Sequence, residues 1–312
     1  MQMDPNGMHM TETDMMRFEW PALGSLRGVD LSLHDANGRP LPLHILHHLA
    51  MYNFDRRGLI HHQVERLFAW GQDTKAVLLP SGVAVPLPKG EHLGFLIAWH
   101  NDTGAEIDAA YVRMTMPYAA PKDVSIEVFP WYLDVHNVNG GRNSFDLPAG
   151  RSSQRLDFQV PLSGRLIAVG GHMHDYALAV RLVDSARGKT LIKLGAERKA
   201  NGDVTGTERF IFGFHDDAFP IRANYTYALM SDYDNTSGTA IPDGGMGQLN
   251  GIFEPDHPAD WPALDLTDPE VIKDLKSLPR DLSCDEEMAG HDMDHMHMDL
   301  PMPTDTAKKP PR

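Results

Sequence analysis

Apolar residues in this chain fall into short runs, each bounded by Gly, Pro, Asn or Asp, and helical spacing is rare. Such runs, separated by turn signals such as Asn37-Gly38 and Asn201-Gly202, are typical of antiparallel β-structure. We expect strands within Leu93–Trp99, Asp108–Met116, Val124–Leu133, Leu156–Val160, Leu166–Val169, Tyr176–Val183 and Tyr225–Met230. The pattern predicts a mainly β protein built from tandem antiparallel β-sandwich (jelly-roll) domains.

Two stretches have helical spacing. Asp268 can cap a helix whose first turn holds Pro269 and whose apolar stripe lies within Val271–Leu275. A weaker pattern predicts a second helix over Leu59–Trp70.

The chain of 312 residues is long enough for about two domains. A boundary near Pro117–Pro121 separates two strand-rich halves, and we found no internal repeat. We expect a Met-rich tail over 1–20, a first sandwich over 21–117, a second over 118–258, and a short helix with an acidic tail over 259–312.

Both ends of the chain are rich in methionine and histidine and lack core periodicity, which predicts disordered tails that bind copper ions. The residues concerned are Met1, Met3, Met8, His9, Met10, Met15, Met16, Met288, His291, Met293, His295, Met296, His297 and Met298.

The formal net charge of −15 makes nucleic acid and anionic lipid unfavourable partners. The lone Cys284 excludes an intrachain disulfide and a Cys-based zinc or iron–sulfur site. No apolar run of membrane-spanning length occurs, and the first residues lack the apolar core of a signal peptide. We expect a periplasmic or secreted protein whose export signal is not in this sequence, and a cytoplasmic location stays open.

His172-Met173-His174 is the clearest candidate for metal chemistry. In a strand, residues two apart point the same way, so the two imidazoles can share one ion. Gly170 and Gly171 allow close backbone approach or a bulge before them. A pair of ordinary surface histidines is the alternative.

The remaining histidines are weaker candidates. Adjacent residues of a strand point to opposite faces, so His47 and His48 could share an ion only at a bend or strand end. Each has a buried structural histidine as its alternative, and so does His100, which follows a strand. His61-His62 lies on the possible second helix, where we expect a solvated face.

Met246 lies in a Gly-rich stretch with few apolar neighbours in sequence, which is unusual for a packing residue. A thioether selects soft metals, above all copper(I).

Five pieces of sequence, taken in order, resemble the copper type II, ascorbate-dependent monooxygenases, the family of peptidylglycine α-hydroxylating monooxygenase and dopamine β-monooxygenase. The resemblance covers roughly residues 25–255 and is carried by the order and spacing of the pieces. They are Leu46-His47-His48-Leu49, Ile97-Ala98-Trp99-His100-Asn101, Gly171-His172-Met173-His174, Tyr233-Asp234-Asn235-Thr236 and Gly245-Met246-Gly247.

The resemblance implies two copper ions on two jelly-roll domains that face each other across a cleft. It implies that His47, His48 and His100 hold an electron-donating copper. It also implies that His172, His174 and Met246 hold the catalytic copper that activates dioxygen. A reductant such as ascorbate would supply electrons, and an aliphatic C–H bond of the substrate would be hydroxylated.

This chain departs from the family pattern in three places. One cysteine cannot form the disulfides of the animal enzymes, which indicates a pared-down, bacterial relative. Gly170 stands where the peptide enzyme has an arginine that binds substrate carboxylate. Gln248 and Asn250 replace the asparagine and tyrosine that follow the family's methionine, so the substrate, small molecule or peptide, is not identified.

Three functions remain open at this stage. The first is a copper monooxygenase, and the second is a copper storage, carrier or sensor protein on the same fold. The third is a scaffold or adhesion sandwich with structural histidines. A serine nucleophile elbow and a Gly-rich phosphate loop are both absent from the sequence.

Overall fold

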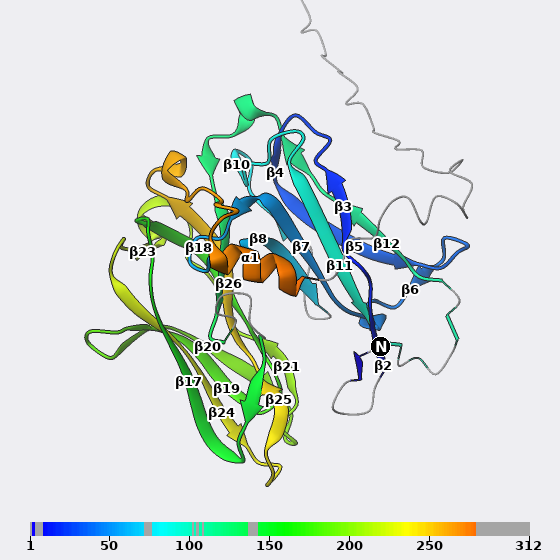
Figure 1. The fold of residues 1–312 in the computed structure, drawn as a ribbon, viewed down its shortest axis with the longest axis vertical. Helices are drawn as coiled ribbons and strands as arrows, with labels where there is room; N and C mark the ends of the chain where they lie inside the picture. Colours follow the sequence, from blue (N-terminus) through cyan, green and yellow to red (C-terminus); the bar gives the residue numbers. More distant parts are fainter. Residues whose placement is uncertain are drawn as a thin grey trace, which may run out of the picture.

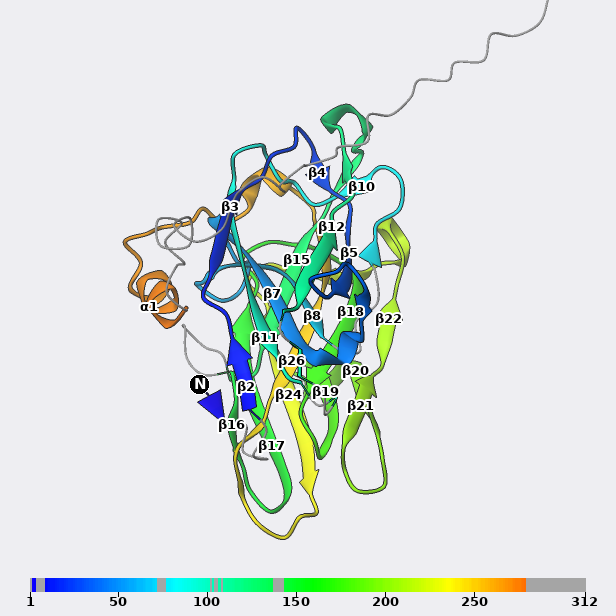
Figure 2. The ribbon, with the colours of Figure 1, turned by 90° about the vertical axis from the view of Figure 1, so that its right-hand side faces the viewer.

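The computed structural model describes residues 2–3, 9–71, 77–101, 103, 106–107, 109–136 and 143–278. Over these residues the protein is mainly β, with antiparallel sheets packed as two successive sandwiches, as the sequence predicts. Most strands of the first half (blue to cyan) and of the second half (green to yellow) occupy separate regions in Figure 1. Helix α1 (Pro269–Ser277) stands at one side of the molecule in the view of Figure 2.

The first sandwich packs one sheet on a second around a core that includes Leu33, Leu49 and Leu93. The larger sheet contains β1 (Gln2–Met3), β2 (His9–Glu12), β3 (Met16–Glu19), β7 (Leu46–Arg57), β8 (Val64–Gly71) and β11 (His92–Trp99). The facing sheet contains β5 (Gly28–His34), β6 (Pro40–Leu41), β9 (Val77–Leu78) and β12 (Tyr111–Thr115). Short pairs join β4 (Ser25–Leu26) to β13 (Tyr118–Ala119) and β10 (Val83–Ala84) to β14 (Ile126–Glu127).

The second sandwich surrounds a core that includes Trp131, Leu182 and Phe253. One sheet contains β15 (Phe129–Asp134), β18 (Gly164–Met173), β22 (Arg209–Ile211), β23 (Phe219–Ile221) and β26 (Gly247–Pro255). The other contains β17 (Gly150–Gln159), β19 (Ala177–Asp184), β20 (Lys189–Arg198), β21 (Val204–Thr207) and β24 (Thr226–Asn235). β16 (Phe145–Leu147) pairs with β25 (Ile241–Gly245). Four single-turn 3-10 helices complete the description, η1 (Leu43–Ile45), η2 (Pro121–Asp123), η3 (His215–Asp217) and η4 (Pro258–Asp260).

The seven expected strand segments all contain strand residues, but the expected helix over Leu59–Trp70 is wrong. Residues 64–71 form β8, which pairs with β7. The register shifts there, from Met51↔Phe68 to Tyr52↔Arg66, and this inserts Leu67 as an extra residue. A bulge breaks the alternation of a strand, and the resulting spacing of buried residues imitates a helix.

Helix α1 confirms the expected late helix. The side chain of Asp268 accepts a hydrogen bond from the backbone N–H of Glu270 at 2.8 Å, and Pro269 occupies the first turn. This is the arrangement in which a carboxylate satisfies one of the free N–H groups at a helix start.

Part of the expected N-terminal tail belongs to the first sheet. Backbones of β2 and β3 pair with β11, and Met15 is fully buried. The Met15 sulfur lies 3.0 Å from the position that a Cβ on Gly94 would take, so it fills the space which that glycine leaves. The expected sandwich therefore begins before residue 21. Met1, residues 4–8 and the acidic tail after residue 278 lie outside the described residues.

The two halves share buried contacts. Leu79 and Val83 of the first half join Val128, Ile167 and Ala218 of the second in one small apolar cluster. At the same junction Trp261 stacks on Phe129, with ring centres 4.2 Å apart, and its Nε1 donates to the carbonyl oxygen of Arg57 at 2.8 Å. The segment that follows η4 returns to the first sheet, where Leu264, Leu275 and Leu278 pack against a second small cluster.

Candidate metal centre

His172 and His174 project from the face of the second sandwich that is turned away from its core. Met173, between them, is buried in that core, so alternation directs its two neighbours outward. The two ring centres are 5.7 Å apart and the rings are nearly perpendicular. Because a metal–nitrogen bond is about 2 Å long, two imidazoles on one ion have ring centres roughly 5–6 Å apart. The pair is spaced for a shared ion.

Met246 reaches the same face from the neighbouring strand. In the antiparallel ladder of β18 and β26, His172 pairs with Gln248 and Met173 with Gly247. Continuing this ladder by one residue sets Met246 opposite His174. The register therefore directs two imidazoles and one thioether to the same side where β18 and β26 adjoin, with His174 and Met246 each one residue beyond its strand.

The backbone of Met246 is held by one hydroxyl. The Tyr233 hydroxyl accepts a hydrogen bond from the Met246 N–H at 2.8 Å and donates one to its carbonyl oxygen. Burial raises the pKa of Tyr233 to about 12, so the hydroxyl keeps its proton and can do both. Tyr233 belongs to one of the five pieces of the resemblance, and this contact gives it a structural role.

The Met246 side chain has a polar neighbour on the same strand. Gln248, 9% exposed, donates from Nε2 to Asp134 Oδ2 at 2.8 Å and approaches the Met246 sulfur at 3.7 Å. Asp134 is fully buried, and its backbone N–H donates to Nε2 of His61 at 3.2 Å. A chain of contacts therefore links the first half of the molecule to the thioether.

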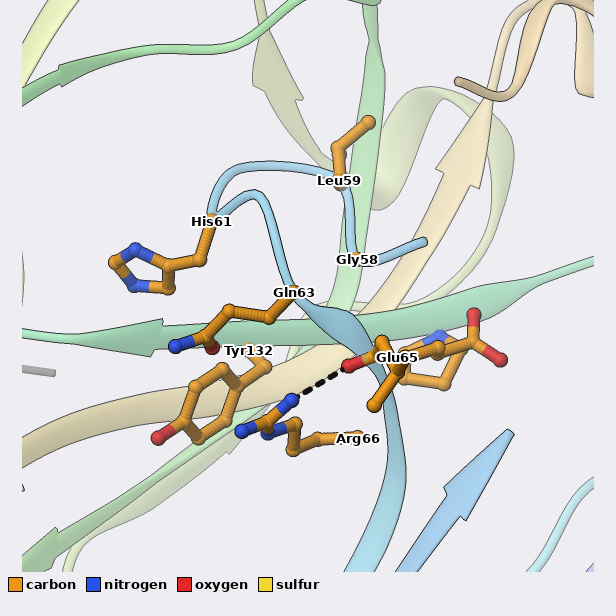
Figure 3. A pocket seen from close by; sticks show the side chains of 9 residues that line it. Gly58, Leu59, His61, Gln63, Glu65, Arg66 and Tyr132 are labelled. Atoms are coloured by element: carbon orange, nitrogen blue, oxygen red, sulfur yellow. Dashed lines mark hydrogen bonds between the residues drawn. The ribbon is translucent and has the colours of Figure 1, made fainter. Parts of the chain in front are cut away.

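The sequence suggested that His61 lies on a solvated helix face, and the structure shows that it does not. It lies in the turn between β7 and β8 and is 6% exposed, because that turn packs against β15 of the second half. With Gln63, Glu65, Arg66 and Tyr132 it lines a cavity of about 10 Å³, room for about one water molecule (Figure 3). Burial, and then the charges of Arg66 and His62, lower the pKa of His61 to about 4.

His47 and His48 lie at the start of β7, where the ladder with β11 is irregular. Leu46 pairs with Trp99 and His48 with Ala98, so His47 is the extra residue of a bulge. Their ring centres are 5.0 Å apart. A bulge redirects side chains that would otherwise point to opposite faces, and this is the strand-end condition under which adjacent histidines can share an ion.

His100 lies beside this pair in the fold. Its backbone N–H donates to the carbonyl oxygen of Ile45 at 2.8 Å, which continues the pairing of β11 with the start of β7. Its side chain does not complete a three-ligand group, since no set of three His, Cys, Asp or Glu side chains placed to hold a metal occurs among the described residues.

The sequence did not point to Asp134, to the burial of His61 or to the contact of Gln248 with the Met246 sulfur. Asp134 is a single acid at the end of a strand, and neither its burial nor its contact with Gln248 has a signal in the sequence. An alternation of Tyr132 and Asp134 with buried Trp131 and Leu133 was visible, and it marks a strand face that carries polar groups.

The donor set on β18 and β26 fits copper better than harder metals. A thioether selects soft copper(I), and imidazole suits copper among other transition metals, whereas hard metals prefer carboxylate and carbonyl oxygens. The fit rests on the chemistry of the three donors and on the spacing of the two rings.

Comparisons with known proteins add little. No protein-family model matches the chain, and no curated protein matches its sequence. Among solved structures, the chain is similar to the major capsid protein P2 of Bacteriophage PM2, with a TM-score of 0.38 and 11% identity. That match covers 80% of this chain and 99% of the capsid protein. A likeness at this level carries no inference about function.

Proposed function

We propose that this protein is a copper-dependent monooxygenase that hydroxylates an organic substrate with O₂ and a reductant such as ascorbate. The observation that supports it best is the ladder of β18 and β26, which brings Met246, one residue before β26, beside the closely spaced rings of His172 and His174 at the end of β18. These three residues come from two segments more than seventy positions apart in the sequence, and the ladder register joins them.

Each residue has a separate part in this proposal. The two imidazoles supply the strong donors, and the thioether supplies a weaker one. Copper bound there would supply one-electron redox chemistry and a position for oxygen. Tyr233 fixes the backbone of Met246, so the sulfur is presented from a constrained position.

The substrate side of this face is open next to His172. Gly170 has no side chain, and a Cβ built on it would meet only the Cγ of Arg209, at 3.7 Å, within contact range. His172 itself is exposed. An organic molecule therefore has access to the proposed site.

The second copper of the proposal would lie at His47 and His48, whose ring centres are 5.0 Å apart. His100, the third ligand that the resemblance implies, has its backbone beside this pair, but its side chain is not grouped with theirs among the described residues. By alternation His48 shares the sheet face of Ala50 and Tyr52, whereas Leu49 and Met51 point into the first core. Arg66 lies over the Tyr52 ring, 5.1 Å from its centre, and lines the junction cavity with Tyr132. Both histidine pairs thus lie on sheet faces that border the junction between the halves.

A second candidate function is copper storage, transport or sensing without catalysis. The observation that favours it is the Met- and His-rich composition of both ends of the chain. Oxygen uptake separates the two functions. The enzyme consumes O₂ with copper and ascorbate, faster than free copper does and in proportion to an added substrate, whereas the carrier does not.

Metal analysis of the full chain tests the sites themselves. We expect His172→Ala and His47→Ala each to lower bound copper by about one ion per chain, and the double variant to lower it by about two. His92→Ala is the matched control, because His92 is an exposed histidine that pairs with Asp55. Any copper bound by the Met- and His-rich ends is the same in every variant, so a difference in bound copper comes from the substituted site. Unchanged copper in both single variants would therefore contradict the proposed sites.

A further inference from the structure

Gln248 holds the thioether of Met246 by a contact that a packing residue would not need. We propose that Gln248, anchored by Asp134, is the positioning residue that aims the Met246 sulfur at His172 and His174. This inference rests on the proposed copper site and adds a specific residue to it. Gln248 is well placed for this role because it follows Met246 by two residues, at the start of β26, and pairs with His172 of β18.

The contacts of Gln248 determine which way its amide points. A carboxylate accepts hydrogen bonds, so the atom 2.8 Å from Asp134 Oδ2 must be the amide nitrogen. On the other side, Asn250 donates from Nδ2 to Gln248 Oε1 at 3.1 Å. The contact with Asp134 therefore assigns the orientation, the Asn250 amide is consistent with it, and an N–H group faces the sulfur.

The amide nitrogen has two hydrogens and two acceptors within reach. One acceptor is Asp134 Oδ2, and the other is the Met246 sulfur at 3.7 Å. A thioether has two lone pairs and is a weak acceptor. The N–H group of Gln248 is directed at one lone pair of the sulfur. The other lone pair is left to coordinate a soft metal ion.

Asp134 keeps this arrangement rigid. Its side chain is fully buried, and its second oxygen accepts from the backbone N–H of His136 at 2.9 Å. Its own backbone N–H is bound by His61 from the other half. A methionine side chain has three rotatable bonds and adapts easily, so an outside anchor is what gives the sulfur one direction.

Outer contacts of this kind affect metal binding strongly. Groups that orient a metal ligand typically change metal affinity by about 10- to 100-fold when they are removed. We therefore expect Gln248→Leu to weaken copper(I) binding at Met246 by at least about 10-fold. Leucine is close in size and apolar, so it fills the site without donating to sulfur.

The experiment is an anaerobic copper(I) titration of the full chain, followed by NMR of ¹³C-methyl-labelled methionine. Each methionine gives its own methyl signal, so the Met-rich ends do not mask Met246, whose signal Met246→Leu identifies. In the wild-type protein the Met246 methyl signal shifts at low copper(I). In Gln248→Leu the same shift requires at least about 10-fold more copper(I).

The control is Gln159→Leu, an exposed glutamine of the same half that donates to Thr226 Oγ1. It should titrate as the wild type does. An unchanged Met246 titration in Gln248→Leu would overturn the positioning role. A Met246 signal that never responds in the wild-type protein would instead contradict the proposed copper site.

A second variant covers the case in which Gln248→Leu does not fold. Asn250→Ala removes the donor to Gln248 Oε1 and leaves Met246 and Asp134 untouched. With the amide less constrained, we expect the Met246 titration to weaken by several-fold while the protein keeps its wild-type methyl spectrum elsewhere. No change in this variant, with Gln248→Leu unfolded, would also overturn the proposal.

Discussion

At the scale of single residues, His61 joins the two halves through an uncharged imidazole. Its Nε2 accepts the Asp134 N–H, and it can do so only while that nitrogen carries no proton. Burial is the largest cause of its lowered pKa, followed by the nearby positive charge of Arg66. The contact thus depends on a histidine that stays neutral well below pH 7.

This histidine should make the protein less stable in mild acid. The pKa of His61 is about 4 when folded, against 6.5 ordinarily, so below pH 6.5 the unfolded chain binds a proton that the folded chain does not. The stability of the protein with a neutral His61 is therefore highest above pH 6.5 and decreases as the pH falls toward 4. We expect the free energy of unfolding to decrease by about 3 kcal/mol over this range. Urea unfolding at pH 7 and pH 4.5 measures it.

The matched variant is His61→Gln, whose amide oxygen can still accept from Asp134 but does not titrate in this range. We expect it to lose less stability than the wild type between pH 7 and pH 4.5. Equal losses in the two proteins would show that other groups cause the acid sensitivity.

Sequence and structure agree for some residues of the candidate site and not for others. The side-by-side projection of His172 and His174 follows from strand periodicity, so the sequence could predict it. The closeness of His47 and His48 depends on a bulge that no periodicity predicts. Asp134 and Gln248 meet through register across two strands, and register is decided by the packing of whole sheets.

At the scale of elements, α1 is attached to β8 by a buried ion pair. Arg66 Nη2 and Asp274 Oδ1 are 2.6 Å apart, and a second contact joins Nη1 to Oδ2 at 2.7 Å. Asp274 also accepts from the backbone N–H of Val64, and its side chain is fully buried. The helix is therefore held on the first sheet by this ion pair as well as by the packing of Leu264, Leu275 and Leu278.

Removing one partner of this pair should destabilise the protein strongly. Asp274→Asn leaves the Arg66 charge buried without its counterion, and a broken buried pair typically costs about 3–5 kcal/mol. Chemical denaturation of the variant measures the loss.

The comparison is with Asp256→Asn, which removes the partner of Arg165 in a pair whose side chains are 36% and 42% exposed. An exposed pair contributes about 0–1 kcal/mol. The double variant Arg66→Met with Asp274→Leu should recover most of the stability, because no unpaired charge remains. A similar, small effect of Asp274→Asn and Asp256→Asn would contradict the role of the buried pair.

Most elements could be predicted, and the exceptions have physical causes. Short apolar runs marked strands wherever one face is buried, and the capping residues marked α1. β8 was mistaken for a helix because the extra residue Leu67 changed its period. The pairing of β3 with β11 was missed because a four-residue edge strand carries too few positions to show alternation.

At the scale of the whole molecule, the halves are coupled by an apolar cluster to which both contribute. Ile167 is 3% exposed there and packs with Leu79 and Val83 of the first half. Shared burial of this kind makes two sandwiches unfold together, since separating them exposes apolar surface on both. We expect a single unfolding transition for the wild-type protein.

Ile167→Ala should weaken this coupling. The substitution should lower the stability by about 2–5 kcal/mol and split calorimetric unfolding into two transitions. Ile192→Ala is the control, because Ile192 is 4% exposed and belongs to the second core rather than to the shared cluster. It should lower the temperature of the single transition without splitting it, because the shared cluster is unchanged. One transition for Ile167→Ala would show that the halves are coupled elsewhere.

The sequence predicted two sandwiches but not how they dock. The composition of a strand shows that it has a buried face, and it does not show which neighbour buries that face. Leu79, Val83 and Ile167 had the pattern of ordinary core residues, yet they belong to the junction. The expected boundary at Pro117–Pro121 separates the two halves along the sequence. In the fold, residues from before and after this boundary pack together in one cluster.

The return of the chain after η4 to the first sheet also sets an order of assembly during synthesis. The sheet face around Tyr52 and Leu96 is complete once β11 has left the ribosome, but the leucines that cover it follow much later, from Leu264 onward. At about 5–20 residues per second, that interval is on the order of 10–30 s. A nascent chain therefore displays a finished but uncovered apolar surface for that time. Chaperones have their opportunity to bind it then, before α1 closes over it.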